Sequence, residues 1–441
     1  MLMTKKEEIL INRLKEISAK GILDAEDADR KENLHRLFMY PAMMVPVTQS
    51  IILQAIKEVL PANSHAIDPY MGSGTSLMSC MEFGLDVYGQ DINPFAVLLT
   101  QSKTCFYDIN ELTNSLQRLE KSIAEDFSDS IDIDYYNLDK WFKKDVQIAF
   151  SKIRRAIISE YNSEYRKFFW VVMSETIRIG SNDRTSTFKL HQRSAEELAK
   201  RNVDVIKEFL TLAKRSIDDL SLYSNKLADE GYLHNCSYKG KSVIKWGNTQ
   251  ESIETDEVFD LLVSSPPYGD NLTTVTYGQT SFLPLLWIDS KDIACPYDYV
   301  KTTSEIDRKS LGGVINKKHI QSKIENLSEK SKTFKSFYDT IPEEEKEKYN
   351  KTVCFMSDFD ESLDVICSHM KSNAYYVWTI GNRFVGGREI PNSEVLLDLM
   401  EYRGINLLCT AERNILNKKQ ACKNRSSRTM EKEQILIFHN I

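Results

Sequence analysis

Short apolar runs alternate with longer amphipathic segments along most of this chain. The short runs have lengths typical of buried strands and lie at residues 66–68, 85–91, 241–248, 259–263, 374–382, 405–410 and 434–438. Helical spacing of apolar residues is found at 4–34, 51–59, 353–372 and 393–402. Strands that alternate with helices predict an α/β fold with a mostly parallel sheet, because parallel neighbours need a crossover connection.

A long segment, 105–238, interrupts this alternation. Within it, apolar and aromatic residues recur at helical spacing through 141–180 and are too dense for a linker. We therefore predict a large helical insertion, packed over the open edge of the sheet, in which the aromatic residues form a core.

Composition and charge set limits on function. The 441 residues, 41% of them hydrophobic, suit one catalytic domain that carries large insertions. A net charge of −7 is not that of a non-specific nucleic-acid binder, so contact with nucleic acid would depend on local basic patches. The eight cysteines form no Cys-x-x-Cys pair, which argues against zinc and favours a reduced, cytoplasmic setting. Apolar runs fall short of the roughly 18 residues that cross a membrane.

A glycine-rich turn follows the first strand. The chain reads Ala66-Ile67-Asp68-Pro69-Tyr70-Met71-Gly72-Ser73-Gly74-Thr75 and then becomes helical. The glycines let the backbone pass close to a ligand, and the start of a helix leaves free N–H groups beside it. A second strand ends at Asp91, about twenty residues after the turn, where a carboxylate can bind ribose hydroxyls. Taken alone, a Gly-x-Gly is equally compatible with an ordinary strand-to-helix turn.

A second motif, Ser265-Pro266-Pro267-Tyr268, follows the apolar run at 259–263. The prolines lack N–H groups and fix φ, so nearby carbonyls stay free to accept hydrogen bonds. The Ser265 hydroxyl adds an acceptor, and the Tyr268 ring offers a face for stacking against a base. This set suits a flat ring that carries an amino group, and a simple Pro-Pro turn is the alternative.

Together the two motifs resemble those of the S-adenosylmethionine-dependent DNA amino-methyltransferases, which usually have Phe where Tyr70 stands. The resemblance implies a doubly wound, seven-stranded sheet with a terminal antiparallel hairpin at 405–410 and 434–438. It implies S-adenosylmethionine as cofactor, double-stranded DNA as partner, and no metal. The implied catalytic residues are Ser265, Pro266, Pro267 and Tyr268. The implied cofactor-binding residues are Tyr40, Pro41, Asp68, Pro69, Tyr70, Met71, Gly72, Ser73, Gly74, Thr75, Asp91, Ile92, Asn93 and Asn248.

The resemblance covers about residues 35–104 and 240–441. It divides the chain into an N-terminal helix and cofactor-binding half (1–104), the helical insertion, a candidate DNA-contacting or target-recognition region (105–238), and a catalytic half (239–441) with a basic insertion at about 290–350. Tyr40 and Pro41 are expected at the methionine end of the cofactor, with a buried loop as the alternative. Asn248, where the family prefers an acidic residue, is assigned to the cofactor's adenine. The spacing from Asn248 to Ser265 leaves room for one short crossover helix.

The implied reaction is methyl transfer to the exocyclic amine of a base. The lone pair of such an amine is delocalised, and acceptors such as Ser265 and the Pro266 carbonyl would localise it on nitrogen. Because this amine is buried in duplex DNA, the nucleotide has to be flipped out. Serine at the first catalytic position resembles the cytosine-N4 enzymes, while adenine N6 stays open. An RNA or protein amine methyltransferase and a non-catalytic DNA-binding relative are the alternatives of other classes.

Three basic segments are candidates for contact with DNA phosphates, with a solvated charged surface as the alternative. The loop 178–193 carries Arg178, Arg184, Lys189 and Arg193, and the loop 414–432 has six Lys or Arg residues against one acid. Residues 305–335 hold eight Lys or Arg residues against four acids, with a flexible joint at 311–313. Behind the second motif, Asp270, Thr273, Tyr277 and Gln279 are candidates for contacting substrate or ordering the loop. By analogy alone, a restriction endonuclease encoded nearby is the expected partner.

Overall fold

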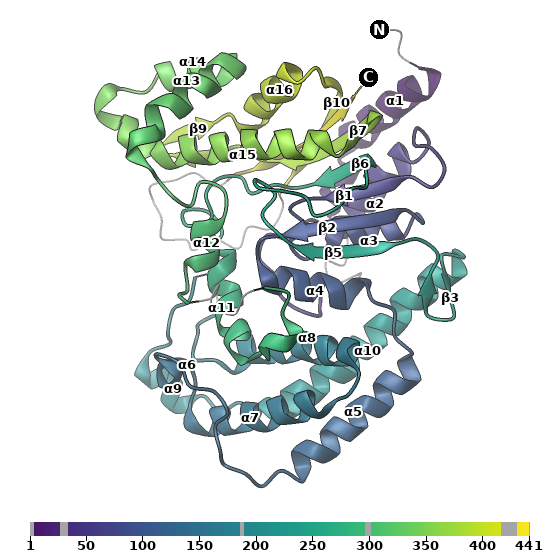
Figure 1. The fold of residues 1–441 in the computed structure, drawn as a ribbon, viewed down its shortest axis with the longest axis vertical. Helices are drawn as coiled ribbons and strands as arrows, with labels where there is room; N and C mark the ends of the chain where they lie inside the picture. Colours follow the sequence, from purple (N-terminus) through teal and green to yellow (C-terminus); the bar gives the residue numbers. More distant parts are fainter. Residues whose placement is uncertain (1–3, 27–33, 186–188, 296–300, 416–429, 441) are drawn as a thin grey trace.

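A seven-stranded sheet forms the centre of the molecule (Figure 1), with the strand order β10-β11-β7-β6-β1-β2-β5. The structure is a computed structural model that describes residues 4–26, 34–185, 189–295, 301–415 and 430–440. The strands of this sheet are β1 (His65–Asp68), β2 (Asp86–Asp91), β5 (Ser242–Trp246), β6 (Phe259–Ser264), β7 (Met370–Ile380), β10 (Asn406–Asn414) and β11 (Lys432–His439).

The strands β7, β6, β1, β2 and β5 run parallel, and β11 is antiparallel to both of its neighbours. All six residues of β6 are buried, as expected for a strand in a sheet that is covered on both faces. The predicted doubly wound, mostly parallel sheet with a terminal antiparallel hairpin is therefore confirmed.

Helices cover both faces of the sheet, and neighbouring residues of one strand enter different cores. Leu261 and Val263 pack on the face that carries α1 (Lys5–Ala19), α2 (Pro46–Ile56) and α3 (Thr75–Met81). Leu262 packs on the opposite face, against α15 (Asn350–Ser368) and α16 (Asn392–Tyr402). This period of two fixes the direction in which each side chain at the strand ends points.

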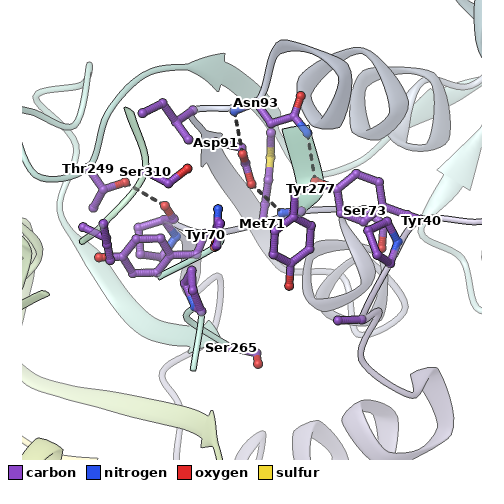
Figure 2. A pocket seen from close by; sticks show the side chains of 18 of the residues that line it. Tyr40, Tyr70, Met71, Ser73, Asp91, Asn93, Thr249, Ser265, Tyr277 and Ser310 are labelled. Carbon is purple, nitrogen blue, oxygen red and sulfur yellow. Dashed lines mark hydrogen bonds between the residues drawn. The ribbon is translucent and has the colours of Figure 1, made fainter. Parts of the chain in front are cut away.

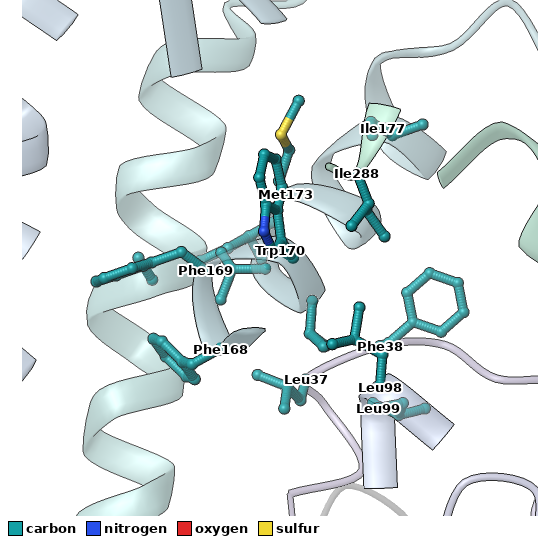
Figure 3. Close-up of a cluster of buried hydrophobic side chains, with 14 of the residues drawn as sticks. Leu37, Phe38, Leu98, Leu99, Phe168, Phe169, Trp170, Met173, Ile177 and Ile288 are labelled. Atoms are coloured by element: carbon teal, nitrogen blue, oxygen red, sulfur yellow. The ribbon is translucent and has the colours of Figure 1, made fainter. Parts of the chain in front are cut away.

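The helical insertion lies beyond the β5 edge of the sheet, at the bottom of Figure 1. Its helices are α5 (Ile109–Ala124), α6 (Leu138–Trp141), α7 (Lys144–Ser159), α8 (Ser163–Gly180), α9 (Ala195–Lys200) and α10 (Val205–Asp229). Figure 3 shows the aromatic run of α8 beside Leu37, Phe38 and two leucines of α4 (Pro94–Thr104). The insertion thus shares one continuous core with the chain on either side of β1. The division of the chain at residues 104 and 238 stays a prediction.

The remaining elements lie around the carboxyl ends of the strands or on the outer surface. They are β3 (Leu233–His234), β4 (Ser237–Tyr238), α11 (Tyr277–Trp287), α12 (Glu305–Lys309), α13 (Ile320–Lys330), α14 (Lys332–Asp339), β8 (Arg383–Val385) and β9 (Arg388–Ile390). The segment 305–335 is therefore largely helical. Gly312 of its predicted joint donates its N–H to Asp358 of α15 at 2.8 Å, so the joint is packed against the core.

Two predictions about local structure are wrong. The first helix ends at Ala19 rather than near residue 34, because Gly21 adopts a left-handed φ of +65° just after it. The expected crossover helix between Asn248 and Ser265 is absent. Residues 247–258 instead form a turn at 249–251 followed by irregular chain. This connection returns from the carboxyl end of β5 to the start of β6, two strands beyond its neighbour β2. An extended chain spans about 3.3 Å per residue against 1.5 Å in a helix, which suits so short a connection.

Candidate active site

The glycine-rich turn between β1 and α3 is held in place by contacts that require its small residues. Gly72 and Gly74 have φ of +50° and +74°, in the region that favours glycine. The Thr100 hydroxyl of α4 donates to the Gly72 carbonyl at 3.1 Å, and the buried Lys103 ammonium donates to the Ser73 carbonyl at 2.8 Å. Burial lowers the pKa of Lys103 to about 7. Two carbonyls of the turn are thus fixed from behind by α4.

Asp91, at the end of β2, binds the turn directly. One carboxylate oxygen accepts the Gly72 N–H at 2.9 Å and the other accepts the Asn93 N–H at 2.8 Å. Burial raises the pKa of Asp91 to about 6, and the two N–H donors oppose that effect. The carboxylate of Asp91 therefore lies beside the glycine-rich turn, as its position at the end of the second strand implied.

An open cavity, which we call the central cleft, lies at the carboxyl ends of β1, β2, β5 and β6 (Figure 2). Its empty volume is about 850 Å³, which includes space that is open to solvent. It brings together these predicted residues: Tyr40, Pro41, Pro69, Tyr70, Met71, Gly72, Ser73, Thr75, Asp91, Ile92, Asn93, Asn248, Ser265 and Pro267. In Figure 2, Asp91 and Asn93 lie on one side of this cleft and Ser265 on the other.

Four predicted site residues do not line the central cleft: Asp68, Gly74, Pro266 and Tyr268. Asp68 is fully buried and accepts hydrogen bonds from the hydroxyls of Ser264 and Ser76 and from the Tyr70 N–H. Its role in the structure is to join β1 to β6. Gly74 lies behind the turn, where a Cβ would stand 2.6 Å from the Thr100 methyl group.

Tyr268 turns away from the cleft, toward the C-terminal hairpin. Its hydroxyl lies 3.2 Å from the Ser265 hydroxyl and donates to the Glu433 carboxylate at 3.0 Å. Its backbone carbonyl accepts from the Asn392 amide at 3.1 Å. Tyr268 therefore borders Ser265 without lining the cavity itself.

Several lining residues were not predicted as site residues: Ala42, Met43, Met44, Gly247, Thr249, Asn271, Ile306, Ser310 and Leu311. Met43 and Met44 were within reach of prediction, because they follow Tyr40 and Pro41 directly. Ile306, Ser310 and Leu311 come from the basic segment 305–335, which was predicted only as a candidate for contact with DNA and carries no cofactor motif. Tyr277, a candidate for substrate contact, stacks on Tyr40 with ring centroids 5.7 Å apart.

Asn248 lines the cleft through a local turn. Its side chain donates to Glu251 at 2.9 Å and accepts from the Gln250 N–H at 3.2 Å. The next residue, Thr249, donates its hydroxyl to the Pro69 carbonyl at 2.7 Å, as Figure 2 shows. The end of β5 is thereby tied to the glycine-rich turn.

Comparisons with known proteins show the family to which the chain belongs. No protein-family model matches the chain. It is 32% identical over 436 residues to Type II methyltransferase M.MvaI of Kocuria varians, a match that covers 94% of this chain and 92% of that protein. The chain belongs to the type II methyltransferase family. A second match, 30% identical over 140 residues, is to Type II methyltransferase M.MjaII of Methanocaldococcus jannaschii and covers 32% of this chain and 23% of that protein.

A solved structure, the rRNA methyltransferase aviRa from Streptomyces viridochromogenes, is 11% identical over 94% of this chain and 92% of that chain. The TM-score is 0.31, which is too low to establish a shared fold. The fold of this methyltransferase is instead defined by its own strand order and register.

The basic segments of this methyltransferase differ in how many of their charges are paired. In the segment 305–335, Lys317, Lys323 and Lys330 form ion pairs of 2.5–2.6 Å with Glu347, Asp358 and Asp360. In the loop 178–193, Arg178 pairs with Glu175 at 2.6 Å. Residues 186–188 of this loop, and residues 416–429 of the basic loop 414–432, lie outside the described residues. Less free positive charge is therefore available in 305–335 than the sequence indicated.

The loop 178–193 is attached to the segment that follows the Ser-Pro-Pro-Tyr motif. The Leu190 N–H donates to the Gln279 side chain of α11 at 3.1 Å. A second, smaller cavity lies between this loop and α11, lined in part by Arg178, Lys189 and Thr280. Gln279 thus holds the loop 178–193, which is a different loop from the one behind Tyr268 that the sequence analysis considered for it.

Across the described ranges, three or more His, Cys, Asp or Glu side chains nowhere come together in a way that could hold a metal ion. The same residues include no helix that is long and apolar enough to cross a membrane.

Proposed function

We propose that this protein is a site-specific DNA methyltransferase that transfers a methyl group from S-adenosylmethionine to the N4 amine of a flipped cytosine. The observation that carries the proposal is that one cavity is lined by both motifs. Gly72 and Asp91 form one wall, and Ser265 and Pro267 form part of another. A donor and an acceptor bound to these walls would face each other, and such positioning can supply much of a methyl-transfer rate.

The residues of the central cleft fit S-adenosylmethionine. Asp91 offers a half-buried carboxylate that would bind ribose hydroxyls, and Ile92 and Asn248 would flank the space for an adenine ring. Tyr40 and Pro41 also line the cleft and would contact the methionine end of the cofactor. When bound, this cofactor supplies a methyl group that its sulfonium already activates.

The chain's own contribution is to hold the amine. The Ser265 hydroxyl and the Pro266 carbonyl would each accept a hydrogen bond from one N–H of the exocyclic amine. These bonds would localise the nitrogen lone pair toward the methyl group. The resemblance of the motif assigns Tyr268 to stacking against the flipped base, although its ring borders Ser265 and does not line the central cleft. This assignment follows from the resemblance of the motif and from the position of Ser265 at the cleft.

The choice of cytosine over adenine depends on Ser265 alone, because serine at this position resembles the cytosine-N4 enzymes. DNA rather than RNA is supported by the kinship with type II methyltransferases over nearly the whole chain. By analogy with such systems, a restriction endonuclease encoded nearby would be the functional partner and the protein would act in the cytoplasm.

Product analysis tests the proposal. The purified protein is incubated with S-adenosylmethionine labelled in the methyl group and with plasmid DNA, ribosomal RNA or cell protein, and the products are digested to nucleosides or amino acids. We expect label in DNA only, as N4-methylcytosine. Label as N6-methyladenine would overturn the choice of base, and label confined to RNA or protein would overturn the substrate class.

A further inference from the structure

The hydroxyl of Tyr268 is linked to an ion pair in the C-terminal hairpin. One carboxylate oxygen of Glu433, on β11, accepts a hydrogen bond from the Tyr268 hydroxyl, with 3.0 Å between the two oxygens. Its other oxygen accepts from the guanidinium of Arg413 at 2.6 Å, and these two residues face each other across β10 and β11. Both side chains are largely buried, with 11% and 15% of Arg413 and Glu433 exposed. An ionised carboxylate paired with arginine has no proton to give, so Tyr268 must be the donor.

This direction determines the direction of the next hydrogen bond. The hydroxyls of Ser265 and Tyr268 lie 3.2 Å apart, and distance alone allows either one to donate. A phenol has a single proton, and in Tyr268 that proton is directed at Glu433. Ser265 must therefore donate to Tyr268, which leaves the lone pairs of the serine oxygen for another partner.

The protonation state of Tyr268 supports this arrangement. Burial and the nearby charge of Glu433 raise the pKa of Tyr268 well above its usual value, so the phenol keeps its proton at neutral pH. Its backbone is fixed independently of Glu433, because Asn392 donates to both the Tyr268 and Gly381 carbonyls at 3.1 and 3.0 Å. Arg413 is also held from α2, where its guanidinium donates to the Thr48 hydroxyl at 3.3 Å.

We propose that Glu433 is a positioning residue that acts through Tyr268 to orient the Ser265 hydroxyl, so that the serine oxygen is a hydrogen-bond acceptor toward the target amine. The inference rests on the proposed function, since it needs Ser265 to face an exocyclic amine. A carboxamide or carboxylate oxygen can only accept, whereas a free serine hydroxyl can donate or accept. The chain Glu433–Tyr268–Ser265 removes that ambiguity and gives the C-terminal hairpin a part in the reaction.

The substitution Glu433→Gln reverses the chain while preserving its shape. Arg413 can only donate, so the new amide would turn its oxygen to Arg413 and its NH₂ group to Tyr268. Tyr268 would then accept from residue 433 and donate to Ser265, and the serine proton would point at the amine. We expect the single-turnover methylation rate to fall roughly ten- to hundredfold, with dissociation constants for S-adenosylmethionine and DNA within about twofold of wild type.

A double-mutant cycle separates this mechanism from a structural role. If Glu433 acts through Ser265, Glu433→Gln will have no further effect on the residual rate of Ser265→Ala or of Tyr268→Phe. An effect of similar size in the Ser265→Ala background, or a wild-type rate for Glu433→Gln, would overturn the proposal. Glu412→Gln is the matched control, because Glu412 lies on β10 of the same hairpin in an exposed ion pair with Lys432, and it should methylate at the wild-type rate.

The result can be read separately from the proposed function. The rate is followed as label in whichever nucleoside the wild-type protein methylates, so an adenine product leaves the test intact. If Glu433→Gln lowers the melting temperature markedly, Tyr268→Phe decides the question. Loss of the phenol frees the serine hydroxyl and is expected to slow the reaction, and an unchanged rate in that variant would also refute the chain. Absence of any DNA methylation by the wild-type protein would instead refute the proposed function.

Discussion

The Ser264 hydroxyl donates a hydrogen bond of 2.6 Å to the Asp68 carboxylate, and both residues are fully buried. Asp68 ends β1, directly before the glycine-rich turn, and Ser264 ends β6, directly before the Ser-Pro-Pro-Tyr motif. This bond therefore sets the position of the two motifs relative to each other. It places the ends of β1 and β6 under the central cleft rather than in it.

Removal of this bond should destabilise the protein. Ser264→Ala leaves a buried carboxylate oxygen with one donor fewer, and we expect the free energy of unfolding to fall by about 1–3 kcal/mol. Urea denaturation followed by circular dichroism measures the change. Ser79→Ala is the control, because the Ser79 hydroxyl is buried and has no hydrogen-bond partner among the described residues. A loss in the control as large as in Ser264→Ala would contradict the role given to the bond.

Replacement of the neighbouring serine should affect the rate instead. In Ser265→Ala the target amine loses one hydrogen-bond acceptor in the transition state. We expect kcat to fall about 10²- to 10³-fold, the effect of removing one group that hydrogen-bonds to developing charge. KM for S-adenosylmethionine should stay near the wild-type value, because Ser265 is expected to contact the base. Steady-state kinetics on a DNA duplex measures both constants. Ser79→Ala makes the same chemical change at a buried position of α3 that does not line the cleft, and it should retain its kcat.

Cofactor binding should weaken below about pH 6. The pKa of Asp91 is raised to about 6, so the carboxylate that would accept ribose hydroxyls is lost as the pH falls through that value. One pH unit below the pKa leaves about a tenth of the carboxylate ionised, so the association constant should fall at most about tenfold between pH 7 and pH 5. Calorimetric titration with S-adenosylmethionine tests this. Asp91→Asn should bind more weakly with a flatter pH profile, and an unchanged profile would assign the effect to another group.

Gly74 should tolerate alanine less well than Gly72. Both have positive φ, but a Cβ on Gly74 would lie 2.6 Å from the Thr100 methyl group, whereas a Cβ on Gly72 would lie 3.5 Å from its nearest neighbour. We expect Gly74→Ala to lose about 1–3 kcal/mol more in unfolding free energy than Gly72→Ala. Adding Thr100→Ser to Gly74→Ala removes the nearest methyl group and should recover part of the loss. Equal losses for the two glycines would show that φ alone sets the cost.

The sequence predicted the parts of the site that depend on short stretches of chain. Gly72 follows β1 and Asp91 ends β2, the two adjacent strands of one crossover unit. Their spacing in the sequence was therefore enough to predict that they lie together. Asp68 was assigned to the cofactor, but its partner Ser264 comes from a strand whose pairing with β1 no local pattern reveals. The Glu433–Tyr268 contact was missed for the same reason, because it joins the hairpin to a turn far away in sequence.

Charge patterns were harder to interpret than apolar patterns. An apolar stripe has one outcome, burial, and the predicted sheet and helical insertion both follow from it. A lysine can remain free or pair with an acid on another helix, and in 305–335 the pairing partners lie on or next to α15. The sequence shows the count of charges in such a segment and not which of them are neutralised.

Asn271 provides a test of where the base lies. It lines the central cleft, is only 5% exposed, and its carbonyl oxygen has no hydrogen-bond partner among the described residues. Buried polar groups are normally paired, so an unpaired amide beside Ser265 and Pro267 suggests a partner on the substrate. The preceding Asp270 holds the loop, since its carboxylate accepts from the Thr273 N–H at 3.1 Å and from Lys351 at 3.3 Å.

We therefore expect Asn271→Ala to lower kcat/KM for DNA by roughly tenfold, the effect of one lost hydrogen bond to a base, without changing the affinity for S-adenosylmethionine. Competition between duplexes that carry the target base and duplexes that carry an abasic site at that position refines the test. The wild-type protein and Asn271→Ala should differ on the first duplex and bind the second equally well. Asn406→Ala, an exposed position on β10, serves as the control. A weaker cofactor affinity in Asn271→Ala would place the amide on the cofactor side of the cleft instead.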